Sequence, residues 1–148
     1  MDQTATEPIT NTPTLQGTIA PRERAANPIA EGVDIGHVHM RAGDLAKIRA
    51  FYVDILGFDV VFQAPTALFL AAGGYHHHLG FNVWRGQGVG PPPPHTVGLD
   101  HWMIVLPSDA DVAEVRGRLS EAGAPSDEVE GGFRVYDPWQ LAVDLVAA

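Results

Sequence analysis

Two stretches of the chain repeat the same order of apolar and polar positions. Each begins with alternating residues, over 35–40 in the first block and 99–106 in the second. Each continues with apolar residues three and four positions apart, over 44–57 and 109–123. Alternation is typical of a strand with one buried face, and the wider spacing is typical of an amphipathic helix. Each block is therefore predicted to begin with a strand that leads into a helix.

The ends of both helices carry residues that suit those positions. Asp44 and Asp109 are predicted N-caps, because a carboxylate there accepts hydrogen bonds from free backbone N–H groups. Gly57 and Gly123 are predicted to follow the helices in the left-handed conformation. The apolar helix positions are Leu45, Ile48, Phe51 and Ile55 in the first block and Val112, Val115 and Leu119 in the second.

Further strands follow each helix. Three are predicted after the first, over 58–63, 66–73 and 76–84, and two after the second, within 132–146. The segment 126–131 is too short and polar to assign. The histidine of the first strand recurs 64 residues later, from His37 to His101. These features predict an α+β fold built from tandem βαβββ modules.

Two segments lack this patterning. Residues 1–33 are rich in threonine, proline and alanine, and are predicted to form a flexible tail without the basic start and apolar stretch of a signal peptide. Residues 85–98 hold four consecutive prolines among glycines, which indicates a polyproline linker. The predicted domain is 34–148, with module one at about 34–84, the proline-rich linker at 85–98 and module two at about 99–148.

Composition narrows the choice of partners. The 148 residues carry 9 basic and 18 acidic side chains and a formal net charge of −9, which disfavours nucleic acids and anionic membranes. The chain has no cysteine, so disulfides, thiolate nucleophiles and cysteine zinc sites are excluded. No apolar run reaches the roughly 18–20 residues of a membrane span. A cytoplasmic protein is the simplest interpretation.

Several motifs in both blocks resemble the vicinal oxygen chelate superfamily, which includes glyoxalase I, extradiol dioxygenases and bleomycin-resistance proteins. They are "GHVHMRAGDLAKIRAFYVDILGF", "AGGYHHHLGFNVW" and, after the proline run, "GLDHWMIVLP". Their order looks like the catechol 2,3-dioxygenase-like branch. The resemblance implies that each module curls its sheet into half of a cup, and that the paired halves hold a divalent metal.

The resemblance also implies three metal ligands, His37, His101 and Asp144. Strand alternation places His37 on the cup face, with Val38 and Met40 opposite, and places His101 and Met103 on the cup face of module two. Asp144 falls on the position of the family's glutamate. Two histidines and one carboxylate are the ligands of non-haem Fe(II) oxygenases. Fe(II) is therefore the favoured cofactor, with Mn, Zn and Ni as alternatives. Strand histidines paired within the fold, and an edge aspartate that reaches water, are the alternatives without metal.

The three consecutive histidines contain a candidate catalytic group. Similarity to the extradiol dioxygenases lays an acid–base histidine over His77. Alternation would put His77 on the face of Leu79 and Phe81, and put His76 and His78 on the opposite face with Gly80 and Asn82. Imidazole titrates near neutral pH and so suits proton transfer. His76 and His78 are interpreted as supporting or surface groups.

The second module departs from the dioxygenase pattern. Its segment before the final strand contains no histidine, and Arg134 stands at the family's tyrosine position, two residues before Tyr136. An arginine in the cup suits an anionic substrate, although a surface strand residue is the alternative. Predicted substrate contacts are Phe81, Met103, Arg134 and Tyr136.

Two classes of function follow from the resemblance. One is a metal-dependent, extradiol-dioxygenase-like oxidoreductase acting on a catechol-like aromatic substrate. The other is a binding protein that sequesters an aromatic metabolite or drug, as bleomycin-resistance proteins do. A glyoxalase-type lyase is less favoured, because the position 43 residues after His37 is Gly80, which has no ligand atom. The cup closes either within one chain or across a homodimer.

Overall fold

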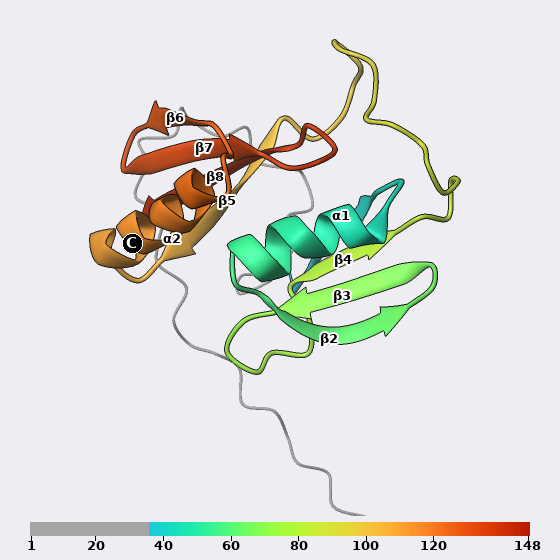
Figure 1. The fold of residues 1–148 in the computed structure, drawn as a ribbon, viewed down its shortest axis with the longest axis horizontal. Helices are drawn as coiled ribbons and strands as arrows, with labels where there is room; N and C mark the ends of the chain where they lie inside the picture. The colour runs from blue at the N-terminus through green and yellow to red at the C-terminus, as the bar shows by residue number, and fades with distance from the viewer. Residues whose placement is uncertain (1–35) are drawn as a thin grey trace, which may run out of the picture. The chain divides into compact units, whose positions relative to one another are not determined.

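A computed structural model describes residues 36–148 (Figure 1). The predicted tail at 1–33 lies outside the described residues, so the tail and the domain boundaries stay predictions. Module one contains two helical segments and four strands. In chain order these are β1 (Val38–Arg41), α1 (Leu45–Arg49), the π-helical η1 (Ala50–Ile55), β2 (Asp59–Ala64), β3 (Ala67–Ala71) and β4 (Leu79–Asn82).

Module two repeats this order with one helix. Its elements are β5 (His101–Leu106), α2 (Asp109–Glu121), β6 (Ser126–Val129), β7 (Gly132–Tyr136) and β8 (Ala142–Ala147). The two sheets have the equivalent strand orders β1-β4-β3-β2 and β5-β8-β7-β6. The first and last strands of each module pair in parallel. The predicted α+β fold of tandem βαβββ modules is confirmed.

The register of the sheets preserves the 64-residue repeat. Val38 pairs with Leu79 in module one, and Trp102 pairs with Val143 in module two. Gly80 pairs with His39, and Asp144 pairs with Met103, so Gly80 and Asp144 occupy equivalent positions. The fold therefore presents the two modules' first-strand histidines at matching sites.

The helix ends agree with the sequence at three of four predicted positions. Asp44 caps α1 by accepting from the N–H groups of Ala46 and Lys47. Gly57 and Gly123 both have positive φ angles. The prediction for Asp109 is wrong, because Ser108 is the N-cap of α2 and accepts from the N–H of Asp111.

The π-helical segment changes which side chains reach the core. Its wider turn places the adjacent residues Phe51 and Tyr52 both in the core, at 6% and 0% exposure, and Leu56 after them. Ile55, expected at the core on α-helical spacing, is only half-buried. The insertion thus brings the Tyr52 hydroxyl into the interior.

One hydrophobic cluster joins residues from both modules. It contains helix residues such as Ile48 and Val115 together with strand residues such as Leu79 and Val143. Tyr52 stacks near Trp102 of β5, with ring centroids 6.2 Å apart, and its hydroxyl donates to Asp137 at 3.0 Å. The two modules are therefore joined by a shared core and by a buried hydrogen bond.

Each sheet has one face packed against this core and one open face that its helix does not cover. Alternation and register assign the open face of module one to His39, Arg41, Ala67, Phe69, Gly80 and Asn82. They assign the open face of module two to His101, Met103, Val105, Gly132, Arg134, Tyr136, Ala142, Asp144 and Val146.

Two strand predictions need correction. The histidine triplet His76–His78 lies before β4, which begins at Leu79, because the chain turns through Gly73 and Gly74 at positive φ. The unassigned segment forms an edge strand, β6, in a hairpin with β7. Gly131, at positive φ, makes the tight turn of that hairpin.

The proline-rich segment at 85–98 contains no helix or strand. It contacts module one where the N–H of Gly88 donates to the carbonyl of Gly43 at 2.7 Å, and module two where Trp139 Nε1 donates to the carbonyl of Val89 at 3.0 Å. A Cβ atom at Gly43 would lie 2.0 Å from that Val89 oxygen. Glycine is therefore required where this segment crosses the start of α1.

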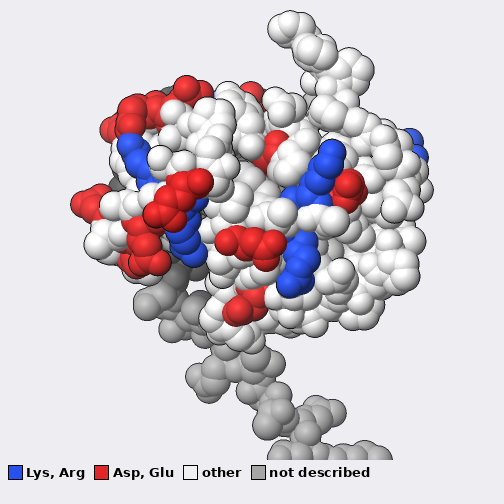
Figure 2. All heavy atoms as spheres, viewed as in Figure 1, with Lys and Arg blue, Asp and Glu red and all other residues white. Residues whose placement is uncertain are grey.

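Acidic side chains of module two gather over α2 and β6 in the view of Figure 2, with few charges over much of module one in that view. In residues 36–148 no helix has the length and apolar character needed to cross a membrane.

Candidate functional site

The open face of module one carries a cluster of histidine and aromatic rings. The rings of His37 and His77 lie 4.6 Å apart, and His77 stacks on Phe69 at 4.9 Å with an interplanar angle of 24°. Since Phe69 belongs to the open face, His77 lies there too. The extrapolated alternation that put His77 on the side of Leu79 is wrong, because the strand has not yet begun at residue 77.

A second group on this face fixes the orientation of His39. The Asn82 amide donates to Nε2 of His39 at 2.8 Å, and its carbonyl oxygen accepts from the N–H of Trp84 at 3.2 Å. Asn82 is 5% exposed, so these bonds satisfy a buried amide. A Cβ atom at Gly80 would lie 3.2 Å from both His39 and Phe69, so their rings fill the space where Asp144 stands in module two.

The open face of module two carries a charged cluster around Asp144. His101 Nδ1 donates to Asp100 at 2.7 Å, and its Nε2 lies 3.9 Å from Oδ2 of Asp144. Arg134, directly opposite Asp144 in the register, donates from Nε to Oδ1 at 2.5 Å and from Nη2 to Oδ2 at 2.8 Å. The residue Asp144 is only 4% exposed.

Each open face carries one titratable group with a lowered pKa, and the causes differ. The Arg134 guanidinium holds the pKa of Asp144 below its usual range, with a smaller contribution from His101. Burial lowers the pKa of His77, and the neighbouring His37, His76 and His39 lower it further. At neutral pH Asp144 is therefore ionised, and His77 is neutral and able to accept a proton.

The donors His101 and Asp144 suit a divalent ion by their chemistry. Imidazole and carboxylate both bind Fe, Mn and Zn, and a carboxylate that orients the far nitrogen of a ligating histidine, as Asp100 does here, is the usual supporting contact. Two donors held at about 2.1 Å by one ion stand roughly 3.0–3.4 Å apart. Their 3.9 Å separation is wider than that range. The types of donor therefore suit a metal, but their spacing in this structure does not match a bound ion.

The complete predicted triad is not brought together. Among residues 36–148, no group of three or more histidine, cysteine, aspartate or glutamate side chains is arranged to hold a metal ion. The structure pairs His101 with Asp144 and places His37 beside His77. Arg134 already occupies both oxygens of Asp144.

The other two histidines of the triplet have separate environments. His76 is exposed and contacts Tyr75, with ring centroids 4.2 Å apart. His78 is half-buried, and its Nδ1 accepts from the N–H of Ala72 at 3.2 Å. Burial lowers the pKa of His78, and the nearby His76 lowers it further. His78 thus closes the turn before β4.

The four predicted substrate contacts are divided between the core and the open face. Phe81 is 0% exposed and packs on Tyr52 at 4.8 Å, so no substrate reaches it in this structure. β4 places it on the core face, one residue from the open-face position of Asn82. Met103 and Tyr136 are exposed on the open face, at 43% and 47%. Arg134, two residues before Tyr136 on β7, is held in the ion pair with Asp144.

Three residues of these clusters were missed from sequence. Asp100, immediately before His101, was a detectable signal, since a carboxylate beside a strand histidine can reach its ring. Phe69 and Asn82 were not detectable, because their roles depend on the pairing of β3 and β4.

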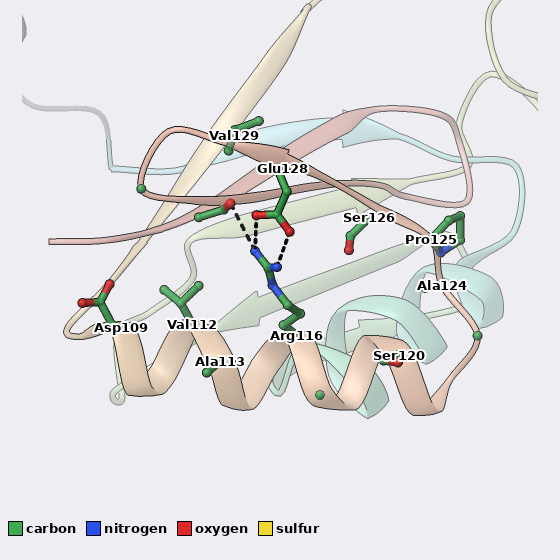
Figure 3. A pocket seen from close by; sticks show the side chains of 14 residues that line it. Asp109, Val112, Ala113, Arg116, Ser120, Ala124, Pro125, Ser126, Glu128 and Val129 are labelled. Carbon is green, nitrogen blue, oxygen red and sulfur yellow. Dashed lines mark hydrogen bonds and ion pairs between the residues drawn. The ribbon is translucent and has the colours of Figure 1, made fainter.

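A groove of about 950 Å³ lies elsewhere, between α2 and the β6–β7 hairpin (Figure 3). Arg116 bridges it with ionic hydrogen bonds to Glu128. A second hollow, of about 510 Å³, lies beside His78 and Met103. The charged cluster of His101, Arg134 and Asp144 lines neither of these hollows, whereas the neighbouring Met103 lines the smaller one.

Comparison with known proteins identifies the class of protein. The model of the Glyoxalase/Bleomycin resistance protein/Dioxygenase superfamily matches residues 34–145, and the chain belongs to this superfamily. Catechol-2,3-dioxygenase of Bacillus subtilis is 45% identical over 106 residues, which cover 70% of this chain and 37% of that protein. Biphenyl-2,3-diol 1,2-dioxygenase 3 of Rhodococcus globerulus is 28% identical over 89 residues, which cover 60% and 47%. The chain thus spans less than half the length of these curated relatives.

Solved structures agree on the fold. Lactoylglutathione lyase from Agrobacterium tumefaciens superposes with a TM-score of 0.62 at 20% identity, covering 80% of this chain and 96% of that one. A glyoxylase/bleomycin resistance protein/dioxygenase domain from Frankia sp. EAN1pec gives 0.60 at 23% identity, covering 78% and 98%.

Proposed function

We propose that this chain is a metal-dependent protein of the extradiol-dioxygenase type that acts on a small catechol-like aromatic molecule. The observation that carries it is the pair formed by His101 and Asp144, with Asp100 orienting the imidazole. The 45% identity to a catechol-2,3-dioxygenase supports the same reaction class. Because the chain spans only part of that relative, its activity is a proposal of ours.

His37, His101 and Asp144 would hold the ion, with Fe(II) favoured over Mn, Zn and Ni. When bound, such an ion would supply the positive charge that polarises the oxygens of a catechol-like substrate. The remaining chemistry belongs to side chains of the open faces.

His77 is the proposed proton acceptor. Its lowered pKa keeps the imidazole neutral near pH 7, so it is able to take a proton from an aromatic hydroxyl. Stacking on Phe69 fixes the plane of its ring. Tyr136 and Met103 offer exposed apolar surface for an aromatic ring on the opposite module.

Oxygen uptake tests the activity directly. Protein loaded anaerobically with Fe(II) is mixed with catechol in aerated buffer and monitored with an oxygen electrode. We expect uptake with formation of a yellow ring-opened product. His77→Ala should slow turnover about 10²–10⁴-fold, the usual loss for a general base, while Fe(II) affinity changes little. No uptake across a panel of substituted catechols would refute the enzymatic proposal.

A second candidate is a binding protein that sequesters an aromatic compound without catalysis. The observation that favours it is Arg134, which neutralises Asp144 without any metal. Module two also lacks a histidine between Gly123 and Asp144. Saturable binding of catechols to iron-free protein, with no oxygen uptake after iron loading, would favour this candidate.

The glyoxalase-type lyase receives less support. Gly80, which has no ligand atom, stands at the position equivalent to Asp144, and a Cβ atom there would lie 3.2 Å from the rings of His39 and Phe69. A homodimer and a cytoplasmic location stay predictions. Exposed apolar side chains on the open faces, such as Phe62 at 50% and Trp84 at 67%, are surfaces that a second copy would cover.

A further inference from the structure

Asp144 is a carboxylate in surroundings that oppose its charge. Its side chain is 6% exposed, and its neighbours along β8 are Val143 and Leu145, both in the core. An ionised group removed from water in this way requires a positive partner nearby. Either a metal ion or a cationic side chain has to supply that charge.

Arg134 supplies it in this structure. The two residues are direct partners across β7 and β8, so the backbone register fixes their approach. The guanidinium makes two parallel hydrogen bonds, one to each carboxylate oxygen, which is the strong bidentate arrangement of arginine with carboxylate. No other residue type provides this fork and a permanent charge together.

The same contact obstructs a metal ion. Oδ2 of Asp144 is the oxygen nearest Nε2 of His101, and it also accepts from Nη2 of Arg134 at 2.8 Å. An ion between the imidazole and this oxygen would lie against the guanidinium. Two positive charges at that distance repel, so the ion and the ion pair exclude each other.

We propose that Arg134 is a specificity-determining residue that holds Asp144 in place of a divalent ion, so that a metal binds only after the guanidinium has left the carboxylate. This inference rests on the proposed function, because it concerns the same ligands. Arg134 thereby weakens metal binding and stabilises the metal-free protein.

The structure also offers a position for the displaced side chain. Asp127 of β6 is the partner of Arg134 on its other side, and its side chain is exposed. The Arg134 side chain is 26% exposed, so it has access to solvent. Rotation away from Asp144 would let the guanidinium pair with Asp127 across the hairpin.

The test compares Fe(II) affinity in Arg134 variants by anaerobic calorimetric titration. Arg134→Gln removes the charge and keeps a hydrogen-bond donor for Asp144. Arg116→Gln is the matched control, since Arg116 forms a comparable ion pair with Glu128 in the groove behind the sheet (Figure 3). We expect Arg134→Gln to bind Fe(II) at least tenfold more tightly than the parent chain, and Arg116→Gln to match the parent.

Two further variants separate this inference from the proposed metal site. Asp144→Asn added to Arg134→Gln should abolish the gain. Arg134→Lys keeps the positive charge beside Asp144 and is the variant to use if Arg134→Gln does not fold. Because lysine makes a single-point contact, its Fe(II) affinity should lie between those of the parent and Arg134→Gln. The role of Arg134 is overturned if the parent, Arg134→Gln and Arg134→Lys chains bind Fe(II) with equal affinity. If Asp144→Asn loses Fe(II) binding in the same experiment, the proposed metal site is still supported. Absence of Fe(II) binding in every folded chain would overturn both.

Discussion

His78 shows how a single ring can couple the fold to pH. Its Nδ1 must be unprotonated to accept from the N–H of Ala72, and burial together with His76 lowers its pKa. The unfolded chain therefore binds this proton more readily than the folded chain does. The stabilising contribution is fully present above the unfolded pKa of about 6.5 and is lost as the pH falls below it.

The free energy of unfolding should therefore decrease as the pH falls through the window below about 6.5. His78→Asn keeps an acceptor close to the position of Nδ1 and does not titrate, so its pH profile should be shallower in this window. Urea denaturation at several pH values measures both chains. At about pH 8 and above, where the parent imidazole is neutral, the difference in free energy of unfolding between the two chains should no longer change with pH. An unchanged slope in the variant would exclude His78 as a source of the pH dependence.

Tyr52 is the second residue whose effect extends beyond its neighbours. Its hydroxyl donates to Asp137, which is 3% exposed and whose pKa is raised by burial. Backbone N–H groups of Trp139 and Leu141 supply the remaining donors to this carboxylate. The side chain of Asp137 thus orders its own turn and connects it to module one.

Tyr52→Phe should destabilise the chain by about 1–3 kcal/mol, because a buried acceptor would lose one of its partners. Tyr136→Phe is the control, since Tyr136 is exposed and should change stability by less than about 0.5 kcal/mol. Thermal and urea unfolding compare the two. Equal stabilities for both variants would show that the hydroxyl of Tyr52 adds nothing to the junction of the modules.

Among the elements, the turn between β7 and β8 contains a strained backbone position. Gln140 adopts a φ of 63° there, a left-handed conformation that costs a side-chain-bearing residue about 1–2 kcal/mol. The hydrogen bonds of Asp137 to Trp139 and Leu141 hold the turn in spite of this cost.

Gln140→Gly should therefore stabilise the chain by about 0.5–1 kcal/mol, after allowance for the greater freedom of glycine in the unfolded state. Gln140→Ala is the matched control, because alanine also lacks the long side chain but keeps the strain. Denaturant midpoints of the three chains give the comparison. Stabilisation by alanine as large as that by glycine would contradict the conformational explanation.

The elements also show how far the sequence predicts this fold. The repeat, the strand faces of His37 and His101, and the ends of both helices at Gly57 and Gly123 follow from local pattern, because burial and turn chemistry act over a few residues. The edge strand β6 was not assigned, because its residues are mostly exposed and carry no apolar alternation. The π-helical turn likewise leaves no local signal, and it is visible only in the burial of Phe51 beside Tyr52.

The candidate site was less predictable than the fold. His101 and Asp144 were identified together from the family motif, and they lie side by side. The pairing of Arg134 with Asp144 depends on the register of β7 against β8, which the length of the intervening turn sets. The position of His77 on the open face depends on where β4 begins. Both are long-range properties that no short window of sequence contains.

At the scale of the whole molecule, the proposed site would draw its residues from both open faces. Module one presents His37 and His77, which are imidazoles, and module two presents the ionised carboxylate of Asp144 beside His101. Neither open face alone presents two histidines and a carboxylate. We propose that both modules supply ligands, so that the repeat itself would be the source of the metal site.

Equilibrium dialysis against Fe(II) under anaerobic conditions, followed by elemental analysis, tests that claim most directly. It compares the untagged parent chain with the His37→Ala, His101→Ala double variant, which retains the triplet His76–His78 as an internal control for unspecific binding. At saturating Fe(II) we predict about one ion per parent chain and none at equal concentration in the double variant. Equal iron content in the two folded chains, or none in the parent, would contradict the proposed site.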